Sequence, residues 1–194
     1  DSVNRVAFSV NRRIDGLILA GCLIDQSEAV RAISMQGVRR GMPLVEIRDR
    51  VTGNRGTDTV NADYRHAAME AMQHLLELGH TRIGLVYAVA QEELGLDRLE
   101  PYRQALDDAG IVRDPTLEVH CGPAVEDGYA AAGQLLDLPE RPTAIMAIND
   151  QMAIAVLRAA GDRGLRVPHD LSVVGFDDNP EARFWVPRLT TATK

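Results

Sequence analysis

Three polar side chains stand at positions where they could bind a small molecule together. Asn149 directly follows one apolar run of strand length and Asp177 follows another, while Arg98 lies after a third run, in the first turn of the next helix. An amide, a carboxylate and a guanidinium together supply the hydrogen-bond donors and acceptors that a polyhydroxylated ligand requires. These residue types therefore favour a binding site for a small polar molecule, provided that the fold brings them together.

The elements that must position these side chains alternate between strand and helix patterns. Apolar runs that fit buried strands lie at residues 14–20, 42–47, 82–87, 117–120, 143–148 and 171–176. Helical patterns separate them, at residues 29–35, 64–78, 97–110, 125–138 and 150–163. This alternation predicts an α/β fold with parallel sheets flanked by helices. Because ligands bind beyond the carboxyl ends of such strands, Arg98, Asn149 and Asp177 should fall on one rim of the sheet.

The same residues have purely structural alternatives. Asn149 and Asp150 could cap the helix that begins there, and Asp177 could shape a turn with its neighbour. Asp150 fits the role of a helix cap better than that of a ligand contact. Asp97 and Glu100 have the spacing of a capping box at the start of a helix. From the sequence, Asn149 could either cap the helix or bind a ligand, and Asp177 could either shape the turn or bind a ligand.

Composition argues against several classes of function. With 194 residues, 45% of them hydrophobic, the chain can bury a substantial core. Its net charge of −7 argues against this chain gripping the phosphates of a nucleic acid by itself. No apolar run reaches the length of a transmembrane helix, so no membrane partner is expected. Cys22 and Cys121 form no C-x-x-C pair and are expected to be free thiols in a reducing compartment.

Sequence motifs of the common enzyme classes are absent. The sequence has no glycine-rich dinucleotide-binding or phosphate-binding loop, and its five histidines do not pair at metal-ligand spacing. Ser172 lies in a predicted strand and lacks the strand-turn-helix setting of a nucleophile elbow. His80 is expected to lie at the end of a helix without a functional role. We therefore expect no catalytic residue, no metal site and no cofactor.

Four segments resemble the LacI/GalR family of transcription regulators, in the family's order and at its spacing. They are Arg-Ile-Asp-Gly-Leu-Ile-Leu at 13–19, His-Leu-Leu-Glu-Leu-Gly-His-Thr-Arg-Ile-Gly at 74–84, Arg-Pro-Thr-Ala-Ile-Met-Ala-Ile-Asn-Asp-Gln-Met-Ala at 141–153, and Gly-Leu-Arg-Val-Pro-His-Asp-Leu-Ser-Val-Val-Gly-Phe-Asp-Asp at 164–178 with Pro-Arg-Leu-Thr-Thr at 187–191. The resemblance implies a type I periplasmic-binding-protein-like fold, with parallel sheets flanked by helices in two subdomains. Residues 1–60 would be part of the N-terminal subdomain and residues 61–194 the C-terminal one. The polar stretch 48–61 is the best candidate for the crossover or hinge.

The resemblance also implies a function. It predicts the ligand-sensing core of a DNA-binding regulator, which binds a small polar effector, a sugar or a related metabolite, in the cleft between the subdomains. Both ends of the family's chain, including its DNA-binding headpiece, would be missing from this sequence, so operator DNA would be contacted only through that headpiece. Such a regulator works in the cytoplasm. The alternative is the periplasmic sugar-binding protein of a transporter, which has the same fold.

Family members place residues that match Arg98, Asn149 and Asp177 against the effector. Asp49 and Asp63 could contribute from the side of the other subdomain. The stretch 121–125 lacks the aromatic residue that relatives often use to stack on a sugar ring, which leaves the class of ligand open.

A homodimer is the second partnership that the sequence predicts. In the helix at 150–163, Ile154 lies off the apolar line that would face the sheet, and Trp185 sits in an apolar group with Phe184 and Val186 after the last predicted strand. In related regulators the matching helix and segment face the twin subunit across a two-fold axis. We therefore expect Ile154 and Trp185 at a dimer interface.

Overall fold

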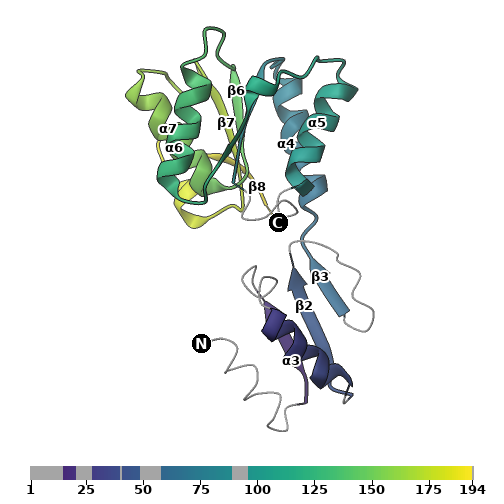
Figure 1. Ribbon diagram of the computed structural model, residues 1–194. Coiled ribbons are helices and arrows are strands. Elements are labelled where there is room, and N and C mark those ends of the chain that lie inside the picture. The colour runs from purple at the N-terminus through teal and green to yellow at the C-terminus, as the bar shows by residue number, and fades with distance from the viewer. Residues whose placement is uncertain (1–14, 21–27, 40, 49–57, 89–95, 194) are drawn as a thin grey trace. The chain divides into compact units, whose positions relative to one another are not determined.

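The strands form two separate parallel sheets, one in each of two units of the chain. The computed structural model describes residues 15–20, 28–39, 41–48, 58–88 and 96–193 (Figure 1). The units are Asp1–Ala62 and Asp63–Lys194, called unit 1 and unit 2 below. None of the described helices combines the length with the apolar character that a membrane span requires.

Unit 1 contains a three-stranded sheet and one described helix. Its elements are β1 (Leu17–Ala20), α3 (Glu28–Arg39), β2 (Leu44–Arg48) and β3 (Asp58–Asn61), and the strand order is β1-β2-β3. Leu19 and Leu44 are buried and have the half-buried Leu17 and Val38 packed against them.

Strand β3 lies within the polar stretch 48–61, the candidate for the crossover or hinge, and was not predicted. Its residues Asp-Thr-Val-Asn pair in parallel with β2, so the last four residues of that stretch belong to the sheet. The sequence pattern missed this strand because it lies at the edge of the sheet, held by backbone hydrogen bonds rather than by an apolar run. Residues 49–57, including Asp49, lie outside the described residues.

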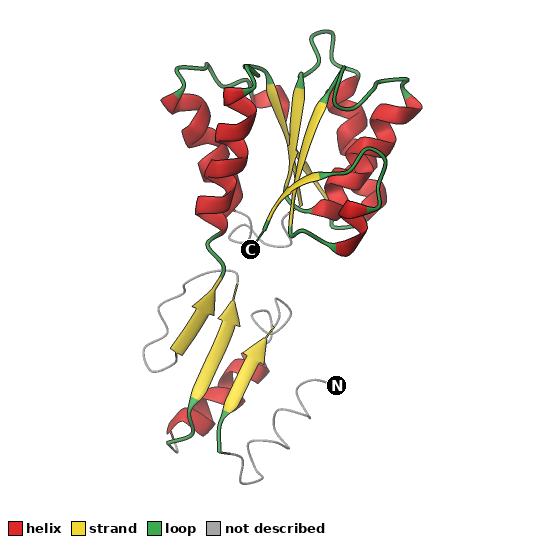
Figure 2. Cartoon of the chain, turned by 180° about the vertical axis from the view of Figure 1, so that it is seen from behind, coloured by secondary structure: helices red, strands yellow, loops and turns green. Residues whose placement is uncertain are grey.

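Unit 2 is a five-stranded parallel sheet with the strand order β5-β4-β6-β7-β8. Its elements are α4 (Tyr64–Glu77), β4 (Ile83–Ala88), α5 (Leu96–Asp108), the 3-10 turn η1 (Pro115–Leu117), β5 (Glu118–Cys121), α6 (Val125–Leu136), β6 (Ala144–Ala147), α7 (Asp150–Asp162), β7 (Ser172–Phe176), the 3-10 turn η2 (Pro180–Arg183) and β8 (Thr190–Ala192). Helices α4 and α5 cover one face of the sheet, and α6 and α7 cover the other (Figures 1 and 2). The predicted α/β class with helix-flanked parallel sheets is confirmed.

Successive residues of the central strands face opposite cores. In β6, Ala144 and Met146 pack on the side of α4 and α5, whereas Ile145 and Ala147 pack on the side of α6 and α7. All four are fully buried. Since side chains alternate across a strand, a sheet covered on both faces needs an unbroken apolar run, which is the pattern that the sequence displayed.

One local prediction at the end of an element is wrong, and one strand was not predicted. The helix expected at 97–110 begins at Leu96, so Asp97 lies within its first turn and not at the N-cap position of a capping box. An acidic residue there still favours the helix, because its charge opposes the partial positive charge of the helix N-terminus. Strand β8 was not expected, since its Thr-Thr-Ala sequence carries no apolar run and its place depends on parallel pairing with β7.

His80 does not simply decorate the end of α4, as the sequence suggested. Its Nδ1 lies 2.9 Å from the hydroxyl of Thr143 and its Nε2 lies 3.0 Å from the hydroxyl of Ser172. Gly79 has a φ of 86° and turns the chain, so the backbone N–H of His80 donates to Leu75 as the last bond of a Schellman motif. The ring thus ties α4 to the start of β6 and β7, and burial lowers the pKa of His80.

Tyr102 carries a buried polar contact of the core. Its ring is 1% exposed, and its hydroxyl donates to the backbone oxygen of Ile83 at 2.8 Å. This bond joins α5 to the first residue of β4. Burial, together with the charges of Glu118 and Asp114, raises the pKa of Tyr102 well above its ordinary value.

We expect Tyr102→Phe to lower the free energy of unfolding by about 1 kcal/mol, because a buried hydrogen bond is lost without a change of packing. Urea denaturation measures the change. Tyr129→Phe is the matched control, since Tyr129 is exposed and its hydroxyl donates to Asp162 on the surface. Equal losses in the two variants would contradict the assignment.

Candidate functional site

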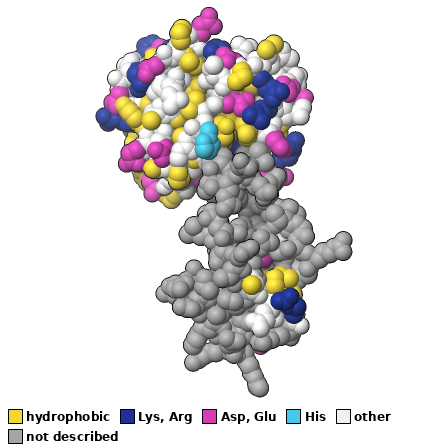
Figure 3. Space-filling view, viewed as in Figure 1, with side chains coloured by type: hydrophobic (Ala, Val, Ile, Leu, Met, Phe, Trp, Pro, Cys, Tyr) yellow, Lys and Arg dark blue, Asp and Glu magenta, His cyan; other side chains and the backbone are white. Residues whose placement is uncertain are grey.

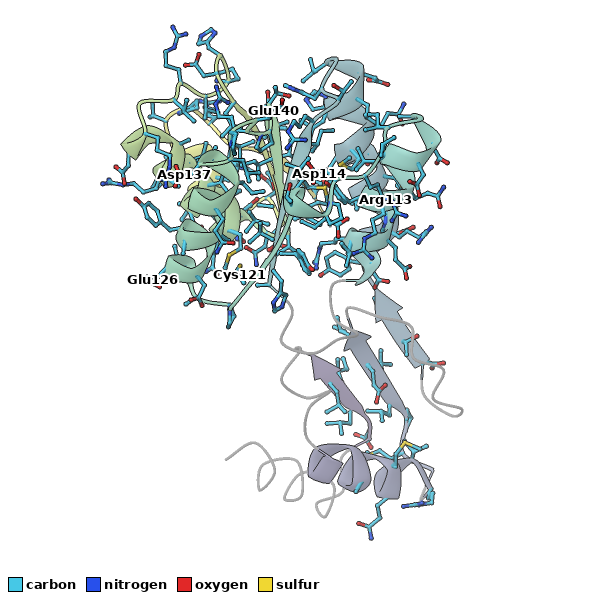
Figure 4. The ribbon with its side chains drawn as sticks, turned by 45° about the horizontal axis from the view of Figure 1, so that its top comes forward. Arg113, Asp114, Cys121, Glu126, Asp137 and Glu140 are labelled. Carbon is cyan, nitrogen blue, oxygen red and sulfur yellow. The ribbon has the colours of Figure 1, made fainter. Side chains whose placement is uncertain are left out.

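All five strands of the unit 2 sheet run in the same direction, so they end along one side, called the carboxyl edge below. Asp177 directly follows β7 there, and Asn149 comes two residues after β6. Cys121, the last residue of β5, lies toward this end of the unit in Figure 4, and Glu140 lies at the opposite end. The edge therefore brings together polar side chains that are far apart in sequence.

Arg98 is held at this edge by two aromatic rings. Its guanidinium carbon lies 4.0 Å from the centroid of the Tyr64 ring and 5.5 Å from that of the Phe176 ring. Tyr64 is the first residue of α4 and Phe176 is the last residue of β7, and both are buried. Stacking of a cation on aromatic faces is favourable and restricts its orientation. Nothing in the sequence pattern singles out Tyr64, which contacts Arg98 only in the folded chain.

The Nε atom of Arg98 is buried and has no hydrogen-bond partner among the described residues. A buried donor without a partner costs free energy, and native proteins seldom leave one unused. The aromatic residue four positions later, Tyr102, is not available as a neighbour, because it faces the sheet core. Arg98 is therefore placed to donate to a group that is not part of the described chain.

Asn149 is the N-cap of α7. Its side-chain oxygen accepts from the backbone N–H of Met152 at 2.9 Å, and its backbone is extended, with φ −155° and ψ 172°. The capping alternative for Asn149 is thus confirmed. The cap uses the side-chain oxygen alone, so it does not occupy the amide nitrogen of this half-buried residue.

Asp150 is not a helix cap, which corrects the prediction. It is the first helical residue, and its fully buried carboxylate accepts from the backbone N–H of Asn179 at 2.7 Å and from the hydroxyl of Thr191 at 2.5 Å. The physical reason is the tilt of side chains toward the start of a helix, which directs Asp150 back to the loop after β7.

Asp177 and Asp178 form the turn that the sequence allowed as an alternative. Their φ angles are 112° and 50°, both in a region that residues other than glycine seldom adopt. The backbone N–H of Asp177 donates to Ala192 at 2.9 Å, and the carboxylate of Asp178 pairs with Arg183 at 2.7 Å. The two adjacent carboxylates thus have different surroundings, with Asp178 engaged in the turn.

Asp63 is the N-cap of α4. Its exposed carboxylate accepts from the backbone N–H of His66 at 2.9 Å. This bond gives Asp63 a structural role one residue before Tyr64, the residue that stacks on Arg98. A ligand contact by Asp63 stays a prediction.

An aromatic pair that sequence reasoning missed lies at the ends of β4 and β5. The rings of Tyr87 and His120 meet edge to face, with centroids 5.2 Å apart, and the two residues are direct partners in the strand register. His120 lies on the same face of β5 as Glu118, which is bonded to Arg103 of α5. The pair therefore lies on the α5 side of the sheet, the side on which Arg98 stacks. The sequence signal for this pair is an aromatic residue in the second-to-last position of each strand, Tyr87 in β4 and His120 in β5.

The carboxyl edge can bind hydrogen-bonding groups but has no arrangement for bond-breaking chemistry. It combines a guanidinium, an amide and carboxylates, which suit the hydroxyl groups of a neutral polar ligand. Within the described ranges, no group of three or more His, Cys, Asp and Glu side chains could hold a metal ion.

A hollow of about 660 Å³ lies elsewhere, along the outer side of α5 and η1. Its charged side chains already pair with one another, Arg103 with Glu118 and Arg113 with Asp107. Because these four charges are already paired, the hollow offers few groups that are free to bind a ligand. The carboxyl edge is therefore the better candidate site.

Comparison with known proteins shows which family the chain resembles. Residues 72–193 match the family model of the periplasmic binding protein-like domain. The HTH-type transcriptional repressor CytR of Escherichia coli K12 is 35% identical over 182 residues, which are 94% of this chain and 52% of that protein. The chain spans about half the length of the curated relatives it matches.

Solved structures of regulators have the same fold. A LacI family transcriptional regulator from Enterococcus faecium with bound ribose is 28% identical, with a TM-score of 0.82, and the match covers 100% of this chain and 70% of that one. A LacI family transcriptional regulator from Mycobacterium smegmatis is 30% identical, with a TM-score of 0.77, covering 97% of this chain and 68% of that one.

These relatives are regulators and repressors, a class of proteins that are not enzymes. They do not favour the alternative of a transporter's solute-binding protein, although that class has the same fold. Their similarity extends over nearly the whole chain and includes both units. The chain therefore belongs to the LacI family of transcriptional regulators and contains that family's periplasmic-binding-protein-like domain.

Proposed function

We propose that this chain is the effector-sensing core of a transcription regulator and that it binds a small polar molecule, a sugar or a related metabolite, at the carboxyl edge of unit 2. The observation that carries the proposal is Arg98, whose guanidinium is stacked on Tyr64 and Phe176 while its buried Nε lacks a partner among the described residues. A cation that is already oriented and has an unused N–H is suited to donate a hydrogen bond to a ligand oxygen.

Asn149 and Asp177 would complete the site from the ends of β6 and β7. The amide nitrogen of Asn149 can donate and the carboxylate of Asp177 can accept, so one ligand hydroxyl could be recognised in each direction. The relative from Enterococcus faecium was solved with ribose, a ligand of this kind. Asp63 and Asp49 are weaker candidates for further contacts, since Asp63 already caps α4.

Regulation would follow if the effector binds one conformational state of the core better than another. Such a difference in affinity shifts the population of states, and the shift can be passed to an attached DNA-binding part. Acidic and basic side chains intermingle on the face of unit 2 seen in Figure 3, which does not resemble a basic surface for phosphates. In this proposal operator DNA is bound through a DNA-binding headpiece of the complete regulator, in the cytoplasm.

We also propose that unit 2 takes part in a homodimer. Phe184 and Val186 are 84% and 92% exposed, and Trp185 beside them is 37% exposed. On α7, Ile154 is only half-buried, whereas its apolar neighbours on that helix are buried. A cluster of large apolar side chains in contact with water favours a partner surface, and a two-fold interface would use each of these residues twice.

The first test is a thermal-shift screen of the chain with D-ribose, D-glucose, D-galactose and cellobiose. A sugar at ~100 times its Kd should add about 2.7 kcal/mol of stability. Arg98→Ala and Asp177→Ala should each weaken binding of the sugar found by roughly 10- to 150-fold in calorimetry, because a charge-assisted hydrogen bond is lost.

Arg113→Ala and Asp107→Ala are matched controls for that test, since these two residues pair with each other and Arg113 lies away from Cys121 at the carboxyl edge (Figure 4). Both should bind like the wild type. Wild-type affinity in both Arg98→Ala and Asp177→Ala would show that the site has been misplaced.

Substitutions at Asn149 should separate capping from ligand binding. Asn149→Ala loses the cap of α7 and should cost about 1 kcal/mol in urea denaturation, whereas Asn149→Ser keeps a capping oxygen and should cost much less. Both lose the amide donor and should bind the sugar more weakly. A normal affinity in the serine variant would reduce Asn149 to a capping residue.

Ile154→Glu and Trp185→Glu should convert the dimer to a monomer in sedimentation, because each places two charges at a two-fold interface. Sugar binding should survive. Val112→Glu is the control, since Val112 is 92% exposed and lies in the connection between α5 and η1 rather than in this cluster. A wild-type chain that sediments as a monomer at tens of micromolar would rule out the dimer.

A further inference from the structure

Asp150 is a carboxylate that the binding proposal does not use, and it is fully buried. Among the described residues it forms no ion pair, although isolated carboxylates are costly to bury. Its environment therefore has to supply hydrogen bonds in place of a cation. Both of its oxygens accept one, and both donors lie at the carboxyl edge.

The donors of Asp150 come from the segment that begins with Asp177. Asn179 donates its backbone N–H to one oxygen at 2.7 Å, and the hydroxyl of Thr191 donates to the other at 2.5 Å. The same Thr191 oxygen accepts from the backbone N–H of Asp178 at 3.3 Å. Asp150 thus holds the chain that follows Asp177. It contacts the backbone of Asn179 directly and reaches the backbone of Asp178 through Thr191.

The held segment has an unfavourable backbone. Asp177 and Asp178 adopt φ angles of 112° and 50° in succession, and such conformations persist only where surrounding contacts impose them. The bond from the Asp177 N–H to Ala192 fixes the near side of the turn, and the Asp150 bonds fix the other. Loosening either side would let the Asp177 carboxylate swing away.

The packing around Asp150 is close on the side of β7. A side chain at Gly175 would place its Cβ 2.5 Å from an Asp150 oxygen, so this glycine makes room for the carboxylate against β7. Burial raises the pKa of Asp150, and the charges of Asp177 and Asp178 raise it as well, against the lowering effect of its hydrogen bonds. Three neighbouring carboxylates are a poor arrangement for stability alone.

We infer that Asp150 is a positioning residue, whose buried carboxylate fixes the backbone from Asp177 to Asn179 and thereby aims the Asp177 side chain at the ligand. The inference rests on the proposed function, because it acts through the proposed contact of Asp177. It assigns Asp150 no contact with the ligand itself.

The first arm of the test follows amide hydrogen exchange in the ligand-free chain by NMR. Asp150→Asn keeps the shape of the side chain but replaces a charged acceptor with a neutral one. Exchange of the Asp177 and Asn179 amides should become roughly tenfold faster, while amides of β4 stay unchanged. Asp162→Asn, the same substitution at the far end of α7, should leave both amides as in the wild type.

Two changes at Thr191 give a second view of the same network. Thr191→Val removes the hydroxyl and should speed exchange at Asn179, because the carboxylate loses one of its two anchors. Thr191→Ser keeps the hydroxyl and should restore the protection. Unchanged exchange in both Asp150→Asn and Thr191→Val would overturn the inference.

The second arm is a double-mutant cycle read by calorimetry, with D-ribose or the sugar that binds best in the thermal-shift screen. Asp150→Asn should weaken binding roughly tenfold in the wild-type background but less than about twofold in Asp177→Ala, where no carboxylate remains to be aimed. A residue that acts only on stability would not produce this coupling with Asp177.

The outcomes separate the two proposals. Suppose that Asp177→Ala weakens sugar binding but Asp150→Asn lowers the affinity by the same factor in both backgrounds. The positioning role is then wrong and the proposed site stands. If Asp177→Ala binds like the wild type, or no sugar binds at all, the proposed site or ligand class is wrong and the positioning role falls with it.

Discussion

The common direction of the five strands in unit 2 is the constraint on which the rest of the structure depends. Because every strand is parallel to its neighbours, every connection must cross the sheet, and the helices fill both of its faces. The strand ends then gather at one edge, where the chain turns and backbone groups are left without ladder partners. Polar side chains are needed there to bond these backbone groups. A ligand can bind the donors and acceptors of those side chains that the turns leave unused.

Residues at the carboxyl edge therefore carry structural and binding duties together. Asn149 caps α7 with its oxygen, which leaves the nitrogen for another partner, and Asp177 occupies a strained turn that only its surroundings maintain. Such double use explains why structural and functional interpretations of the sequence could not be separated at these positions. The strain is tolerated because hydrogen bonds on both sides of the turn oppose its relaxation.

Much of the architecture was determined by local sequence. Unbroken apolar runs determined the central strands, since a strand with helices on both faces of its sheet buries both of its sides. Helical spacing of apolar residues, followed by a glycine at the helix end, determined α4 and its neighbours. The placement of Asn149, Asp177 and Arg98 at one edge also follows from order along the chain, because parallel strands all end on the same side. Two of the motifs that resemble the LacI family, at 141–153 and 164–178, include the turns that carry Asn149 and Asp177.

Only the tertiary structure decided which partner each of these side chains meets. Strands β3 and β8 exist through pairing with a neighbour, which an apolar pattern does not record. Asp150 looked like a helix cap until its carboxylate met Asn179 and Thr191, residues 29 and 41 positions away. The stack of Arg98 on Tyr64 and Phe176 likewise joins three separate elements. Sequence spacing determines the order of elements, but contacts between distant residues depend on how those elements pack.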